Sequence, residues 1–231
     1  MNNPSPIIIL ISANAEWSSV KSHYAPEQLD QSPFGELFLE NINGRKVIFL
    51  QGGWGKISAA ASAEYAIQTW NPELVINLGT CGGFKGQIER GTILLPDRIL
   101  SYDIIEQMGD QQEAIDFYTT RLDHSWLKQP YPLPVEKGVL VSGDRDIVPT
   151  DIPGLIQKYS SRAADWESAS VAWVTAKIHH RRCLILREVS DLVSDEGGEA
   201  YGGLEFFEES SRRIMKRLCE SLSGWLACAG L

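Results

Sequence analysis

The stretch LVINLGTCGG, residues 74–83, joins a largely apolar run to a glycine-rich end. A strand that is buried on both faces carries apolar residues at consecutive positions, whereas a half-buried strand alternates. Glycines directly after such a run favour either a bare tight turn or a loop whose backbone approaches a ligand closely. The stretch therefore predicts a buried strand that ends at a candidate binding loop.

Apolar runs of the same kind occur at residues 7–11 (IIILI) and 183–186 (CLIL), with helical patterns between them. The last helix is the clearest, because its apolar residues fall on one stripe. These are Phe207, Ile214, Leu218, Leu222 and Trp225. Alternating strands and helices predict an α/β fold, a three-layer sandwich around a central mixed, mostly parallel twisted sheet. With no linker or internal repeat, we expect residues 1–231 to form a single domain.

Three regions give weaker signals. Residues 92–95 and 98–102 read as two short strands, and residues 107–134 as an irregular excursion over the core with room for one helix. Residues 195–203 form a glycine-rich mobile loop, either a lid over a site or a passive surface loop.

The composition argues against several classes of function. A net charge of −9 repels phosphate backbones and anionic membrane surfaces, so we expect neither nucleic acid nor membrane partners. Four cysteines without a CxxC pair predict reduced thiols in the cytoplasm and no metal site. The apolar run at residues 7–11 lacks the basic flank of a signal peptide, and no run reaches the ~18 residues of a membrane span.

Carboxylates follow three of the predicted strands. Glu16, Glu167 and Asp191 each stand beside small residues, where ligands collect in open α/β sheets. Glycosidic hydrolysis needs an acid for the leaving group and a base for water, and a carboxylate can accept both protons of a ribose cis-diol. Spacing alone leaves another interpretation open, in which these are solvated loop acids or helix caps.

Four motifs carry a resemblance to a known family. They are VINLGTCGG (residues 75–83), LVSGD (140–144), ADWES (164–168) and REVSD (187–191). In order and spacing the chain resembles the nucleoside phosphorylase and nucleosidase superfamily, and within it the methylthioadenosine/S-adenosylhomocysteine nucleosidases. The resemblance covers nearly the whole chain and is weakest at residues 107–134. It implies the nucleoside phosphorylase fold and hydrolysis of a purine nucleoside to free base and a ribose derivative.

The resemblance assigns catalytic roles to three residues. Asp191 is similar to the general acid that protonates purine N7, which makes the base a neutral leaving group. Ser190 would orient that acid, and Glu16 matches the glutamate that activates water. The family needs no metal and no cofactor, so none is expected.

Substrate-binding residues follow from the same comparison. Glu167 matches the glutamate that holds the ribose hydroxyls and stabilises developing positive charge. Thr80 and Gly82 would line the ribose side, and Ile147 would offer backbone groups to the edge of adenine. The resemblance also implies a homodimer in which a neighbour's side chain covers the 5′ pocket.

Departures from the family pattern concern the base and the sugar. Asp146 stands where a phenylalanine usually packs on the base, and Trp166 where a methionine lies beside the ribose. Asp146 removes an apolar wall and adds charge, whereas Trp166 adds bulk. These changes leave another purine nucleoside or a futalosine-type compound open as the substrate.

Asn77 bears on the choice between water and phosphate. Related phosphorylases often carry a phosphate-binding arginine at this position, and a phosphate dianion without a guanidinium is poorly neutralised. Lys56 is expected on the outward face of its helix, and Arg187 is expected to pair with Glu188 or Asp165. Water is therefore the expected nucleophile. A phosphorylase and a non-catalytic nucleoside-binding protein are the alternatives.

Overall fold

The central strand of the sheet shows why its apolar run is unbroken. The computed structural model describes residues 4–231, and in it β1 (Ile7–Ile11) pairs in parallel with β4 (Arg45–Gln51) and β5 (Leu74–Phe84). Ile7, Ile9 and Ile11 pack toward α1 (Asn14–Tyr24) and α6 (Leu204–Cys228). Ile8 and Leu10 pack on the other face, toward α2 (Gly55–Trp70) and α5 (Ser168–Ala172). Helices cover both faces, so neither tolerates polar side chains.

The strands of residues 4–231 form one 11-stranded mixed sheet in the order β11-β10-β6-β8-β9-β5-β1-β4-β3-β2, with β7 attached to β6. Because β10 (Arg182–Ser194) also pairs with β5, five strands close into a ring: β5, β9 (Ser161–Asp165), β8 (Glu136–Ser142), β6 (Ile93–Ser101) and β10. The remaining elements are β2 (Asp30–Ser32), β3 (Gly35–Ile42), β7 (Thr119–Arg121), β11 (Gly197–Gly198), α3 (Gln111–Phe117), α4 (Ile152–Tyr159), a 3-10 turn (Pro149–Asp151) and a π-helical turn (Trp173–Ile178) that continues α5.

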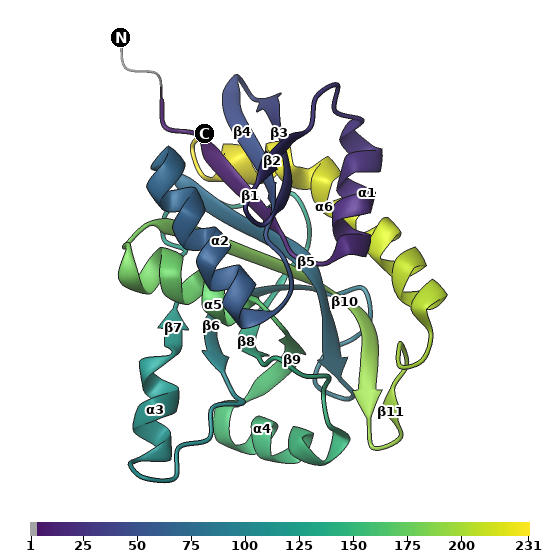
Figure 1. Ribbon diagram of the computed structural model, residues 1–231. Coiled ribbons are helices and arrows are strands. Elements are labelled where there is room, and N and C mark those ends of the chain that lie inside the picture. Colours follow the sequence, from purple (N-terminus) through teal and green to yellow (C-terminus); the bar gives the residue numbers. More distant parts are fainter. Residues whose placement is uncertain (1–3) are drawn as a thin grey trace.

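Figure 1 shows the layers directly, with α2 and α5 in front of the sheet and α6 behind it. The predicted fold class, an α/β sandwich around a mixed sheet, is confirmed. Parallel pairing holds where β4, β1, β5 and β10 lie side by side, and antiparallel pairing occurs at the β2–β3–β4 edge and where the ring closes. None of the helices described in residues 4–231 is long and apolar enough to cross a bilayer.

Three local expectations were wrong. The strand that was predicted to end at a loop of residues 79–83 continues through these residues, because β5 extends to Phe84 and pairs with β10 along this length. Residues 93–101 form one strand, because a bulge between Pro96 and Arg98 absorbs the interruption that suggested two strands. The strand predicted at residues 183–186 extends to Ser194, so the REVSD motif lies within β10 and not in a loop after it. The expected excursion at residues 107–134 contains α3 and β7, and the glycine-rich segment contributes β11, which pairs with the end of β10.

Candidate active site

One cavity of about 610 Å³ opens beside β5, β9 and β10, and every candidate site residue lines it. The candidates are Glu16, Thr80, Gly82, Asp146, Ile147, Trp166, Glu167, Ser190 and Asp191. They come from segments far apart in the sequence, and most of them lie at the ends of neighbouring strands, as expected for an α/β sheet.

Arg187 lies at the centre of the polar residues beside the cavity and is only 1% exposed. Its Nε lies 2.8 Å from an oxygen of Asp165 and donates to Ser168, while Nη2 donates to Asn77 at 2.7 Å. Nη2 also lies 3.9 Å from Glu167. We call Arg187 with Asp165, Ser168, Asn77 and Glu167 the Arg187 cluster. Of the two expected partners of Arg187, the structure selects Asp165; Glu188 instead faces Arg217, 3.3 Å away.

Gly79 makes room for the guanidinium. A Cβ atom at this position would lie 1.8 Å from Nη1 of Arg187 and 2.9 Å from Oε1 of Glu16. The glycine that follows the LVINL run is therefore required by close packing of side chains, and its backbone φ is not in the left-handed region.

Glu16 is fixed by Thr80. Its Oε1 accepts hydrogen bonds from the backbone N–H of Thr80 at 2.7 Å and from the Thr80 hydroxyl at 2.9 Å. Burial raises the pKa of Glu16, against the lowering effects of Arg187 and of these hydrogen bonds. A buried carboxylate held in one orientation with a raised pKa has the properties of a general base near neutral pH.

Glu167 joins the start of α2 to the Arg187 cluster. Its Oε1 accepts a hydrogen bond from the backbone N–H of Gly55 at 3.1 Å, and the next N–H, of Lys56, donates to Asp144 at 2.6 Å. Burial raises the pKa of Glu167 to about 8, although the nearby Arg187 guanidinium lowers it. Two carboxylates thus occupy the N–H groups at a helix N-terminus, which otherwise attract anions such as phosphate.

Asp191 is directed into the cavity by a bulge in β10. Val189 aligns with Cys81 and Asp191 with Gly82, so Ser190 is an extra residue on the β10 strand. Consecutive side chains of a regular strand point to opposite faces, but here the Ser190 hydroxyl donates to Asp191 at 2.6 Å. Burial raises the pKa of Asp191, against the hydrogen bonds from Ser190 and from the backbone of Ala200. A carboxyl that keeps its proton to higher pH suits a general acid.

The opposite part of the cavity is built from loops. Ile147 is buried against Gly82, where a Cβ atom would lie 2.8 Å from its Cδ1, and the Ile147 carbonyl accepts from the Tyr201 hydroxyl at 2.8 Å. Asp146 and its neighbour Arg145 are exposed at the cavity wall. We call Arg145, Asp146, Ile147 and Tyr201 the loop end.

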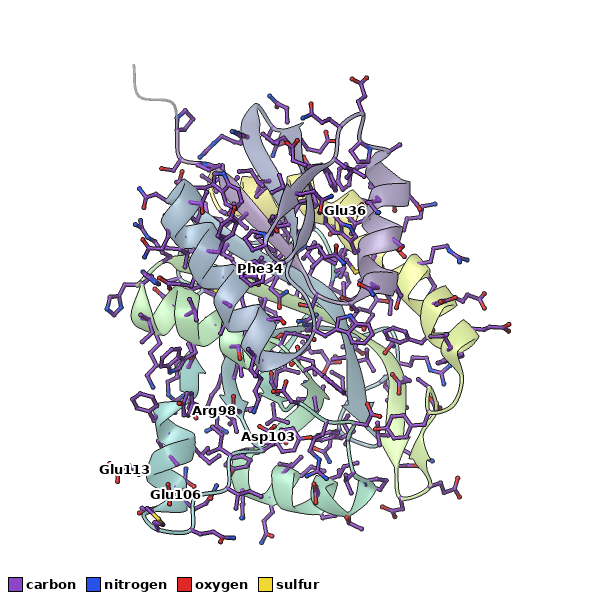
Figure 2. The ribbon with its side chains drawn as sticks, in the orientation of Figure 1. Phe34, Glu36, Arg98, Asp103, Glu106 and Glu113 are labelled. Carbon is purple, nitrogen blue, oxygen red and sulfur yellow. The ribbon has the colours of Figure 1, made fainter. Side chains whose placement is uncertain are left out.

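Two further expectations were wrong. Lys56 is not on an outward face: its side chain is 20% exposed and forms an ion pair with Asp103, which lies between α2 and α4 (Figure 2). The site also does contain a guanidinium, since Arg187 approaches Asn77, although its donors are already directed at acceptors of its own cluster.

Sequence reasoning missed Arg145 and Tyr201 as cavity residues. Arg145 lies inside the segment that joins LVSGD to Ile147, and Tyr201 is the aromatic residue of the glycine-rich segment 195–203. An aromatic side chain among glycines was a usable signal, because glycines allow a ring to lie close to the backbone. Within residues 4–231, no group of three or more His, Cys, Asp or Glu side chains is arranged to hold a metal ion.

Comparison with known families decides the affiliation. A model of the Phosphorylase superfamily matches residues 7–227. The chain belongs to this superfamily. The resemblance read from the four motifs is thereby confirmed.

Members of the superfamily with related sequences include 5′-methylthioadenosine/S-adenosylhomocysteine nucleosidases. That of Maridesulfovibrio salexigens is 28% identical over 172 residues, covering 69% of this chain and 74% of the relative. That of Staphylococcus epidermidis is 27% identical over 203 residues, covering 81% and 87%.

Solved structures show the same superfamily fold. The Helicobacter pylori 5′-methylthioadenosine/S-adenosylhomocysteine nucleosidase, bound to butyl-thio-DADMe-Immucillin-A, superposes with a TM-score of 0.79 at 17% identity, over 96% of this chain and 99% of that one. The futalosine hydrolase of the same organism gives 0.78 at 17% identity, over 94% and 97%.

Proposed function

We propose that the protein hydrolyses the N-glycosidic bond of a purine nucleoside, releasing free base and a ribose derivative. The observation that carries the proposal is the placement of one cavity between two sets of carboxyl groups. Asp191 with Ser190 stands on one strand, and Glu16 and Glu167 stand beside Arg187. Relatives in the superfamily include nucleosidases and a futalosine hydrolase.

Bond cleavage begins with Asp191. Its carboxyl donates a proton to N7 of the purine, the electrons of the C1′–N9 bond pass to the base, and positive charge develops on the ribose. In its deprotonated form, which its pKa of about 8 makes increasingly populated above neutral pH, Glu167 accepts hydrogen bonds from the ribose hydroxyls and stabilises that charge. Water then attacks C1′ and gives a proton to Glu16, whose orientation is set by Thr80.

Three contacts support water over phosphate as the nucleophile. The donors at the start of α2 are occupied by Glu167 and Asp144, and Arg187 is held by Asp165. A phosphate dianion would have to displace carboxylates of its own sign from these donors, which is unfavourable in a buried site.

We also propose a homodimer in the cytoplasm. Trp54, Trp166 and Leu204 line the cavity yet are 61%, 37% and 70% exposed, so a second copy could cover its mouth. The cytoplasmic location rests on four free cysteines, among them the buried Cys81, Cys183 and Cys219. Sedimentation measures the assembly directly, and a fully active monomer would contradict the dimer.

Base release from a panel of nucleosides tests the proposed reaction. The panel contains methylthioadenosine, S-adenosylhomocysteine, adenosine, inosine and a futalosine analogue, each with and without phosphate. Release without phosphate from at least one compound is expected, and release only with phosphate would identify a phosphorylase. Binding without release would instead identify a nucleoside-binding protein.

The variant Asp191→Asn tests the proposed role of Asp191 as the general acid. Loss of the acid should lower turnover by about 10²–10⁴-fold while nucleoside affinity stays within about tenfold. Asp195→Asn, which changes an exposed acid four positions along the chain, is the control. Equal turnover in the two variants would remove Asp191 from its role.

A further inference from the structure

We propose that Tyr201 reads the substituent at C6 of the purine and selects 6-amino over 6-oxo nucleosides. The proposal rests on the proposed function, and its first observation is the hydrogen bond of 2.8 Å between the Tyr201 hydroxyl and the Ile147 carbonyl. A backbone carbonyl can only accept, so the hydroxyl must be the donor. Its single proton is thereby engaged, and the oxygen presents lone pairs to its surroundings.

The second observation is that Tyr201 and the proposed acid share one segment. The backbone N–H of Glu199 donates to the carbonyl of Leu192 at 3.1 Å, which turns the segment back toward Asp191, and Asp191, Ala200, Tyr201 and Ile147 all line the cavity. In a purine, N7 and the C6 substituent lie on the same edge. A base whose N7 faces Asp191 therefore directs its C6 substituent toward the Tyr201 side of the cavity.

The chemistry at C6 then decides the preference. An amino group donates a hydrogen bond to the free lone pairs of the Tyr201 hydroxyl oxygen. This bond extends the series of hydrogen bonds that runs from Tyr201 to the Ile147 carbonyl. An oxo group is an acceptor and meets a second acceptor. To bond it, the Tyr201 hydroxyl would have to turn away from Ile147 and leave a buried carbonyl without its donor, which costs binding energy.

The position of the tyrosine ring is fixed by a glycine. A Cβ atom at Gly198 would lie 2.6 Å from Cε1 and 2.8 Å from Cδ1 of Tyr201, so the ring lies directly against the Gly198 backbone. The φ of Gly198 is not in the left-handed region, so alanine is tolerated by the backbone there. Gly198→Ala should therefore displace the ring without straining the chain.

The test compares adenosine with inosine, which differ only at the base. In the unaltered protein kcat/KM should favour adenosine, and Tyr201→Phe should lower this preference about three- to tenfold, the size expected for one neutral hydrogen bond. Gly198→Ala should lower it in the same direction. Tyr102→Phe is the control, because the Tyr102 hydroxyl is buried with no hydrogen-bond partner within residues 4–231 and does not line the cavity.

Calorimetry with free adenine and hypoxanthine separates this inference from the proposed function. If no nucleoside is cleaved but adenine binds more tightly than hypoxanthine, and Tyr201→Phe reduces that difference, the hydrolase proposal fails and the role of Tyr201 stands. A preference for inosine and hypoxanthine would overturn the inference. The inference would also be overturned if Tyr201→Phe, like the control Tyr102→Phe, left the adenosine-to-inosine ratio of kcat/KM unchanged.

Discussion

An arginine pairs with an aspartate both in the Arg187 cluster and at the loop end, but the first pair is buried and the second is exposed to solvent. Arg187 is 1% exposed and lies 2.8 Å from Asp165, whose side chain is 3% exposed. Arg145, at the loop end, lies 3.6 Å from Asp151 with the two side chains 44% and 39% exposed. Buried ions depend on each other for solvation, whereas exposed ions have water. We therefore expect substitutions in the Arg187 cluster to destabilise the fold and substitutions of the exposed ions at the loop end to leave it intact.

The two arginines give the largest expected contrast. Arg187→Leu leaves Asp165 and Glu167 buried without their counter-charge, which should cost about 3–5 kcal/mol of unfolding free energy. Arg145→Leu removes an exposed pair and should change it by less than about 1 kcal/mol. Denaturant unfolding of both variants measures the difference. Similar losses would mean that Arg187 is not the centre of a buried cluster.

Gly79, in the Arg187 cluster region, and Gly154, in α4, differ in how closely they are packed. Gly79→Ala places a methyl group 1.8 Å from Nη1 of Arg187, so overpacking of about 1–3 kcal/mol is expected, together with loss of turnover. Gly154, in α4, has open space around its Cβ position, and Gly154→Ala should stabilise the helix by about 0.5–1 kcal/mol. Thermal unfolding compares the two, and a neutral Gly79→Ala would show that the Arg187 guanidinium has room to shift.

Protonation of the buried Glu167 should make the stability of the protein depend on pH. The pKa of Glu167 is raised to about 8 in the folded chain, so the folded state binds more protons than the unfolded one between the ordinary carboxyl pKa and 8. Its contribution to stability is present at low pH and lost as pH rises through about 8. The thermal midpoint should therefore fall between pH 5 and 9. Glu167→Gln should flatten this slope, and an equally steep slope in that variant would assign the proton to another group.

The smallest effect is expected at Asp146. Because Asp146 is exposed, Asp146→Asn should leave the unfolding free energy within about 0.5 kcal/mol of the unaltered protein. If Asp146 contributes to substrate choice, relative kcat/KM values across the nucleoside panel should change without loss of stability. A destabilised variant would show that Asp146 behaves like the buried ions of the Arg187 cluster.

Local patterns were sufficient for the architecture. The run at residues 7–11 predicted a strand covered on both faces, and its residues do alternate between α1 with α6 and α2 with α5. The stripe of the last helix was also right from Ile214 to Trp225, although Phe207 lines the cavity. Apolar spacing reports burial because each face of an element must exclude water along its whole length.

The motifs and the resemblance also named a set of polar residues that the fold brings to one cavity. That a single domain spans residues 1–231, and that these residues have the catalytic and binding roles assigned to them, stay predictions.

Contacts between distant segments were decided only by the tertiary structure. Glu167 receives its hydrogen bond from Gly55, 112 positions away. The partner of Arg187 was ambiguous until closure of the strand ring brought the end of β9 and the start of α5 to the Arg187 side chain. The bulge that brings Ser190 and Asp191 to one side and the bond from Tyr201 to Ile147 have no local sequence period. Side-chain spacing along one element encodes which face is buried, but the partner of a buried charge depends on which strands lie side by side, and that is set by packing of the whole chain.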